Sequence, residues 1–187
     1  MRVVIDACVL FPTVMREIVL GVATTGAFMP LWSERLLEEW ARAAARIGPE
    51  SETQARGEIA LLRAHWPGSV IASAPGLESR LWLPDESDIH VLATALSASA
   101  DGIMTLNAKD FPRGVLAEEG IARYDPDSFL MEVWQEMPDA VQGVGDQVLA
   151  QARTLSDAEW DMRTLLKKAR LPRLAKALSS EASARRS

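Results

Sequence analysis

The stretch MRVVIDACVLF (residues 1–11) contains a short β-branched run that is followed at once by a single acid. Val3, Val4 and Ile5 favour a strand, and a continuous apolar run of this length is typical of a central strand covered on both faces. An ionised carboxylate is costly inside such a strand. Asp6 therefore either simply ends the strand or belongs to a site at its carboxyl end, and the second reading requires further acids at the same place.

Strands and helices alternate along the chain after this stretch. Extended segments are predicted around residues 2–5, 28–32, 69–73, 101–106 and 121–125, and helices around 12–26, 33–46, 50–65, 85–100 and 126–137. Because parallel strands need helical crossovers, this order predicts an α/β fold, a three-layer α/β/α sandwich with a mostly parallel central sheet. Helices alone follow at about 139–154, 156–169 and 171–180. We expect one domain over 1–137 and a helical C-terminal extension over 138–187.

Composition is that of a globular protein: 187 residues, 48% hydrophobic and 25% charged. Cys8 is the single cysteine, which excludes an intramolecular disulfide and a cysteine zinc site, and we expect it to be a small core residue. The start of the chain has no secretory signal pattern, and no segment reaches the roughly 20 apolar residues of a membrane span. The sequence thus predicts a cytoplasmic protein that does not enter a membrane.

The charge of the chain is unevenly distributed. The net charge is −6, yet the end of the chain carries eight basic residues against the single acid Glu181, namely Arg163, Lys167, Lys168, Arg170, Arg173, Lys176, Arg185 and Arg186. Such a tail is typical either of a solvated helical face or of a surface that contacts phosphates.

Two helices bring acids towards the sheet. Glu39 lies three residues after Leu36 and flanks the apolar stripe of its helix, whereas Glu38 points further towards water. Asp88 lies in the first turn of the next acidic helix, on the face that should pack inward, while Asp85 is the better capping residue. Taken alone, these are ordinary positions for solvated or helix-capping acids.

A third group follows the segment around 101–106. Thr105, Asn107 and Asp110 in TLNAKDFP lie just past the end of that strand, and in a parallel sheet this is the edge at which Asp6 lies. A polar turn closed by Phe-Pro also accounts for them. Carboxylates that meet at one place repel one another unless a cation neutralises them, and oxygen ligands suit Mg²⁺ or Mn²⁺ rather than zinc.

The order of these acids resembles that of the PIN-domain ribonucleases, in particular the bacterial branch of VapC-type toxins, over residues 2–136. The matching residues are Asp6 in VVIDACVL, Glu39 in SERLLEEWARA, Asp88 in PDESDIHVLATAL and Asp110 in DGIMTLNAKDFP. One position departs from the pattern, because many members carry an acid where this chain has Asn107.

The resemblance implies an endoribonuclease that depends on Mg²⁺ or Mn²⁺ and hydrolyses RNA phosphodiester bonds. Asp6, Glu39, Asp88 and Asp110 would be its catalytic and metal-binding residues. Thr105 and Asn107 would support them, and Lys109 and Arg113 would be available to RNA. The resemblance further implies the toxin of a toxin–antitoxin pair, with a cognate antitoxin as partner, and we also expect a homodimer.

Other readings stay open at this point. An RNA-processing nuclease without an antitoxin and a degenerate PIN module that binds RNA or protein without cutting share the same pattern. A phosphatase with a nucleophilic aspartate needs a second acid two residues after Asp6, where this chain has Cys8. His65 and His90 share no short metal-ligand spacing, and an α-helical projection places His90 about 200° from Asp88, which predicts a packing or surface role.

Overall fold

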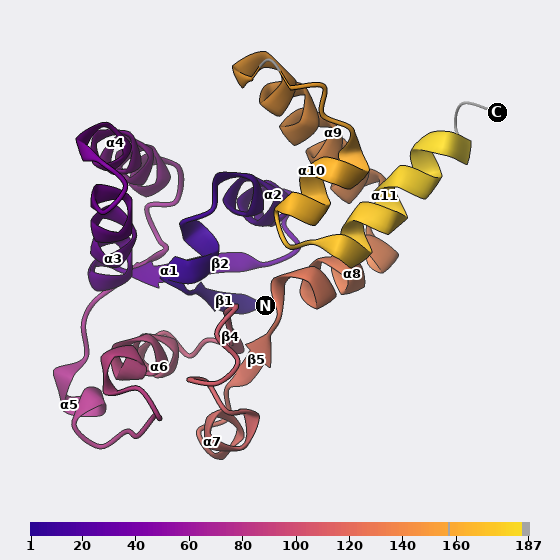
Figure 1. Ribbon diagram of the computed structural model, residues 1–187. Helices are drawn as coiled ribbons and strands as arrows, with labels where there is room; N and C mark the ends of the chain where they lie inside the picture. The colour runs from indigo at the N-terminus through magenta and orange to yellow at the C-terminus, as the bar shows by residue number, and fades with distance from the viewer. Residues whose placement is uncertain (157, 185–187) are drawn as a thin grey trace. The chain divides into compact units, whose positions relative to one another are not determined.

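The structure is a computed structural model that describes residues 1–156 and 158–184 (Figure 1). Its backbone falls into two compact units that are interleaved in sequence. The first unit contains Met1–Phe11 and Phe28–Tyr124, and the second contains Pro12–Ala27 and the described residues from Asp125 onward. Arg185 and Arg186, which belong to the basic tail of the sequence, lie outside the described residues.

The first unit is built around a five-stranded sheet with the order β3-β2-β1-β4-β5. Its strands are β1 (Arg2–Ile5), β2 (Met29–Ser33), β3 (Val70–Ile71), β4 (Gly102–Met104) and β5 (Ala122–Tyr124). Every neighbouring pair is parallel, which confirms the predicted sheet. Val3, Val4 and Ile5 are fully buried, as expected for a central strand with both faces covered. The carboxyl ends of β1 and β4 are therefore neighbours.

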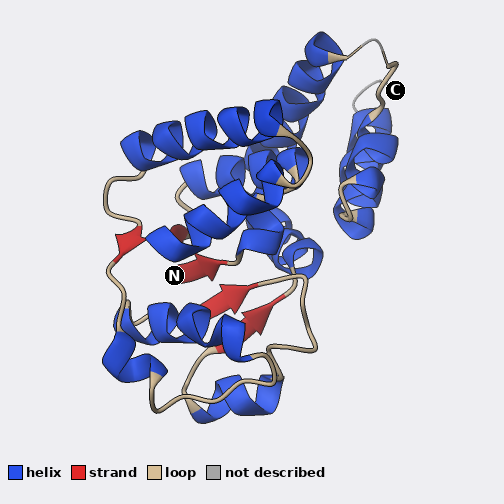
Figure 2. Ribbon diagram, turned by 60° about the vertical axis from the view of Figure 1, so that its left-hand side comes forward, coloured by secondary structure: helices blue, strands red, loops and turns tan. Residues whose placement is uncertain are grey.

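Helices of this unit cover both faces of the sheet, so it is the three-layer sandwich that the sequence predicts (Figure 2). The longer helices are α3 (Glu34–Ala45), α4 (Pro49–His65) and α6 (Ile89–Ser97). Ser33 caps α3 by accepting a hydrogen bond from the Leu36 backbone N–H at 3.3 Å. α3 packs against α4, and α6 packs on β1, β2 and β4.

Several short elements were not predicted, because they are too short to show periodicity. They are α1 (Ala7–Leu10), α5 (Pro75–Glu78), α7 (Arg113–Glu118) and the 3-10 helix η1 (Glu86–Asp88), which directly precedes α6. The segment 85–100 was predicted as one helix, but its first turn is η1.

The second unit is entirely helical and contains α2 (Thr13–Thr24), α8 (Pro126–Glu136), α9 (Pro138–Leu155), α10 (Met162–Lys168) and α11 (Pro172–Ala184). The buried carboxylate of Asp127 accepts hydrogen bonds from the backbone N–H groups of Arg173 and Leu174 at 2.9 and 3.0 Å, at the start of α11. The helix predicted over 156–169 is shorter in the structure. Among the described residues, no helix is both long and apolar enough to cross a membrane.

Candidate metal centre

Asp6 follows β1 directly and is nearly buried, with 7% of its surface exposed. Its backbone N–H still donates to the Met104 carbonyl of β4 at 3.0 Å, and α1 begins at the next residue. Its Oδ2 accepts a hydrogen bond from Thr105 Oγ1 at 2.7 Å and one from Cys8 Sγ at 3.0 Å. The carboxylate is thus held at the shared carboxyl edge of β1 and β4.

Cys8 is a partly buried hydrogen-bond donor to this carboxylate, which is a more specific role than the core residue that the sequence suggests. Burial, and then the charge of Asp6, raise the pKa of the Cys8 thiol to about 12. The thiol therefore stays protonated at neutral pH and donates to Asp6 Oδ2. The position of Cys8, two residues after Asp6 in a short helix, was the only signal of this contact in the sequence.

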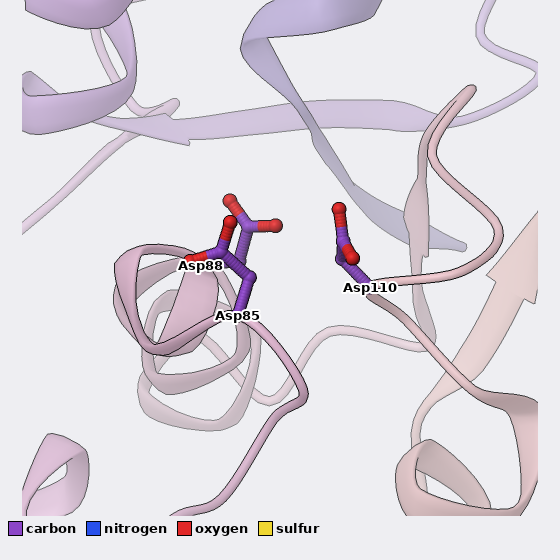
Figure 3. Close-up of side chains that lie close together, drawn as sticks. All are labelled: Asp85, Asp88 and Asp110. Atoms are coloured by element: carbon purple, nitrogen blue, oxygen red, sulfur yellow. The ribbon is translucent and has the colours of Figure 1, made fainter.

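Asp85, Asp88 and Asp110 form the tightest acidic group, because each offers a carboxylate oxygen within 4.8 Å of the other two. Figure 3 shows Asp85 and Asp88, at the two ends of the η1 turn, facing Asp110 from the loop after β4. Asp85 also caps η1, since its Oδ1 accepts hydrogen bonds from the Ser87 backbone N–H at 2.9 Å and from Ser87 Oγ at 2.7 Å. The sequence assigned Asp85 to capping alone, and only its spatial position adds it to the acidic group.

The polar turn after β4 positions Asp110. Asn107 Nδ2 donates a hydrogen bond to Asp110 Oδ2, and the Asn107 backbone N–H donates to Thr105 Oγ1 at 2.9 Å. Arg123 of β5 fixes the same turn, because its Nη1 donates to the carbonyl oxygens of Ala108 and Phe111 at 2.7 and 2.9 Å. Asn107 thus supports an acid of the group.

The pKa of Asp88 is affected by the charges of all the other acids predicted for the site. Burial first, and then the charges of Asp6, Asp85, Asp110 and Glu39 in that order, together raise the pKa of Asp88 from 3.8 to about 6. Asp6 and Glu39 lie outside the 4.8 Å group but are close enough to oppose ionisation of Asp88. Five carboxyl groups from distant parts of the chain therefore converge.

Glu39 approaches this cluster from α3. Its Oε1 lies 2.9 Å from His90 Nε2 and accepts a hydrogen bond from Arg35 Nε at 3.4 Å. Arg35 Nη2 also donates to the Ser87 carbonyl at 3.2 Å, which joins α3 to η1. Glu38 instead pairs with Arg42 and Arg56, whose hydrogen bonds lower the pKa of Glu38. The two adjacent glutamates thus have different surroundings.

His90 is buried, with 3% of its surface exposed, and neither ring nitrogen makes an aligned hydrogen bond within the described residues. Its Nε2 nevertheless lies at ion-pair distance from Glu39, a contact that the helical projection did not predict. The burial of His90 agrees with the packing role that the projection predicts, and its Nε2 lies beside Glu39 of α3 rather than within the group of Asp85, Asp88 and Asp110.

The remaining predicted residues lie nearby in sequence but are exposed. Lys109 precedes Asp110, and Arg113 begins α7. Neither makes an ion pair within the described part of the chain.

The donor set of this cluster fits a hard divalent cation. Asp85, Asp88 and Asp110 supply carboxylate oxygens, and the repulsion that raises the pKa of Asp88 would be relieved by a cation bound between them. A soft ligand is missing from the group, because the Cys8 thiol is protonated and bonded to Asp6. Among the described residues this is the only group of acids, histidines and cysteine with such spacing.

Comparison with known proteins gives one match. The family profile of the PIN domain matches residues 2–109, which is more than half of the chain. The matched range includes Asp6, Glu39, Asp85 and Asp88 and ends one residue before Asp110. No curated protein and no solved structure matches the chain.

Proposed function

The chain belongs to the PIN-domain family, and from this premise we propose that it is an endoribonuclease that depends on Mg²⁺ or Mn²⁺. PIN domains are generally nucleases. The observation that carries the proposal is the convergence of Asp6, Glu39, Asp85 and Asp110 on Asp88, whose pKa is raised to about 6 by burial first and then by these neighbouring charges. Surface acids without a shared ligand have little reason to converge on a partly buried carboxyl group.

In the proposed site, Asp85, Asp88 and Asp110 hold the cation, and Asp6 and Glu39 act as further ligands or hold its water. Once bound, such an ion polarises a phosphodiester and activates water for hydrolysis. Thr105 and Cys8 orient Asp6, while Asn107 orients Asp110. Without a cation, the cluster repels the RNA backbone, so the same carboxylates govern both substrate binding and chemistry.

Finer assignments rest on the order of acids in the sequence. We propose that the chain is the toxin of a VapC-type pair that acts in the cytoplasm as a homodimer with a cognate antitoxin. We also propose that the nuclease domain spans 1–137, with Lys109 and Arg113 in contact with RNA. Growth arrest on expression of the chain, relieved by the product of a neighbouring small gene, would test the toxin assignment.

Cleavage of a mixed RNA pool tests the nuclease itself. We expect the wild-type chain to cut with Mg²⁺ or Mn²⁺ and not with EDTA. Asp88→Asn and Glu39→Gln should lower the rate by roughly 100-fold or more, as expected for lost transition-state stabilisation of about 3 kcal/mol.

Glu38→Gln is the matched control, because Glu38 is adjacent in sequence but pairs with Arg42 and Arg56. It should cut within about twofold of the wild type, since an exposed ion pair contributes little to the fold. Equal losses for both glutamates, or cutting that persists in EDTA, would contradict the proposal. RNA binding without cutting in every metal condition would instead favour the degenerate module.

A further inference from the structure

The second unit carries a concentrated positive charge that the nuclease centre does not use. Residues 163–176, from α10 through the turn into α11, contain no acid and are called the basic hairpin below. α10 packs against α11. All basic side chains of the hairpin are exposed, namely Arg163, Lys167, Lys168, Arg170, Arg173 and Lys176.

The partners of these cations among the described residues are few. None of them makes an ion pair within the described residues. Lys168 Nζ lies 4.9 Å from the ring centroid of Trp160, and Arg173 Nη1 donates a hydrogen bond to Ser128 Oγ at 3.0 Å. Both contacts leave the positive charge uncompensated.

The exposed arginines of α3 and α4, unlike the basic residues of the hairpin, pair with acids. Arg42 pairs with Glu38 at 3.2 Å, Arg56 pairs with Glu38 and Glu52 at 3.1 and 2.8 Å, and Arg63 pairs with Glu34. In the hairpin, by contrast, the nearby carboxylate of Asp127 accepts hydrogen bonds from the backbone N–H groups of Arg173 and Leu174, and no ion pair joins an acid to a hairpin side chain among the described residues.

Arg170 adds an independent observation. Its φ is +63°, the left-handed conformation that favours glycine. The Arg170 backbone N–H donates to the Lys167 carbonyl at 3.0 Å and that of Leu171 donates to Leu166 at 2.9 Å, which is the usual ending of a helix with glycine at this position. An arginine at this position is less favourable for the local backbone than a glycine.

Favourable interaction with a helix dipole explains the positions of only some of these cations. Lys167 and Lys168 lie in the last turn of α10, where cations interact favourably with the helix dipole. Arg173 and Lys176 lie near the start of α11, where the dipole disfavours cations.

We propose that the basic hairpin binds the phosphate backbone of RNA and is a second RNA-binding surface, outside the residues that match the PIN profile. The charge of the hairpin indicates that it binds a polyanion, and the proposed nuclease function is the reason for taking that polyanion to be RNA. The hairpin carries six exposed cations within 14 residues, so several phosphates of one RNA can be neutralised together. Binding of this kind is independent of base sequence and supplies affinity and retention.

An anionic membrane fits the hairpin less well than RNA. Surface helices that bind lipid present an apolar face to the bilayer. The apolar side chains of the hairpin are instead buried, including Leu165, Leu166, Leu171 and Leu174. A surface with exposed cations and no exposed large apolar side chain is suited to phosphates that stay in water.

Binding of a fluorescein-labelled 20-nucleotide RNA to the full-length chain in EDTA tests the proposal without cleavage. The hairpin variant is Arg163→Gln, Lys167→Gln and Lys176→Gln, and the matched control is Arg42→Gln, Arg56→Gln and Arg63→Gln, with the same change in charge. We expect the hairpin variant to bind roughly 10-fold or more weakly at low salt. The slope of log Kd against log salt should fall in magnitude by about 2, because each phosphate contact contributes about 0.7. The control should stay within about threefold of the wild type.

The variant Arg170→Gly removes one positive charge from the hairpin without an expected loss of stability. Glycine suits the left-handed backbone, so the melting temperature should stay equal or rise, while the RNA affinity falls a few-fold and the salt slope decreases by about 0.7. This variant keeps the proposal testable if the triple variant folds poorly.

Equal effects of the two triple variants, or unchanged binding by the hairpin variant, would overturn the inference. Wild-type binding to phosphatidylserine vesicles that the hairpin variant loses, with unchanged RNA binding, would overturn it in favour of a membrane. If the hairpin variant binds RNA as the wild type does and the chain still cuts RNA, the inference is rejected and the proposed nuclease function stands. Hairpin-dependent RNA binding by a chain that never cuts would instead support the inference and reject the nuclease.

Discussion

Asp88 is a carboxyl group whose ionisation is opposed by burial and by four neighbouring acids. Its folded pKa of about 6 exceeds the ordinary value of 3.8, so the folded state holds the proton more tightly than the unfolded chain. The stability that this protonation contributes is complete below about pH 4 and is lost as the pH rises through about 6. Metal binding, which needs the ionised group, should weaken over the same range as the pH falls.

Asp88→Asn should therefore stabilise the metal-free chain at pH 7 and leave it unchanged near pH 3.5. The expected gain in the free energy of unfolding is roughly 1 kcal/mol, because solvent screens a half-buried group. Urea denaturation in EDTA at several pH values measures it. Asp85→Ala should have the opposite sign at pH 7, because Ser87 lowers the pKa of Asp85 and the substitution removes the cap of η1. Loss of stability in Asp88→Asn at neutral pH would contradict the assigned repulsion.

His90 is the buried neighbour of Glu39, with Nε2 2.9 Å from Oε1. His90→Phe keeps a ring in the core but removes this contact, so Glu39 should hold its position less well. We expect the affinity for Mn²⁺, measured by isothermal titration calorimetry, to fall by roughly 10-fold, which is typical of partners that orient metal ligands.

His65→Phe is the control, because His65 is exposed and lies against Trp66 rather than near the cluster. It should leave Mn²⁺ affinity unchanged. A folded His90→Phe chain that binds Mn²⁺ as the wild type does would remove His90 from the account of the site.

At the scale of elements, the packing of β4 against β5 depends on a glycine. A Cβ added to Gly102 would lie 2.4 Å from Tyr124 Cε2 and 2.6 Å from the Ala122 carbonyl oxygen. Gly102→Ala should lower the free energy of unfolding by roughly 2 kcal/mol, because overpacking forces the strands to shift. Gly114→Ala in α7 meets nothing within 4 Å and should stabilise the chain by roughly 0.5–1 kcal/mol. Urea denaturation compares the two, and equal stability of both variants would show that the β4–β5 contact tolerates a methyl group.

The turn after β4 and the 3-10 helix η1 have a common feature, since each is a short element fixed by side chains from elsewhere. Arg123 holds the carbonyl oxygens of the turn, and Arg35 holds Ser87 of η1. Loops that carry functional residues need such support, because they lack the ladder of hydrogen bonds that holds a strand.

At the scale of the whole molecule, the net charge of −6 is the sum of regions of different sign. The acidic cluster gathers carboxylates at the carboxyl edge of the sheet, whereas the basic hairpin gathers exposed cations in the helical unit. Net charge alone would predict weak interaction with RNA. The local distribution predicts affinity for RNA phosphates, and its contribution decreases with salt because exposed charges are screened within about 10 Å at 0.1 M.

The sequence by itself determined the order of strands and helices and the parallel sheet, because hydrophobic periodicity can be followed within each segment and parallel strands need helical crossovers. The family followed from a resemblance in the order of the acids, and the family profile confirms it. It also led to Asp6, Glu39, Asp88 and Asp110, each through its place at a strand end or on a helix. Their catalytic and metal-binding roles stay predictions.

Only the tertiary structure decided which other residues surround these acids. Thr105 donates to Asp6 across 99 positions of sequence, and Arg35 reaches Ser87 across 52. Asp85 joins the acidic group, and His90 of α6 lies beside Glu39 of α3. Periodicity describes one element at a time, whereas a site is formed by the ends of several elements, so its membership depends on packing that no single segment encodes.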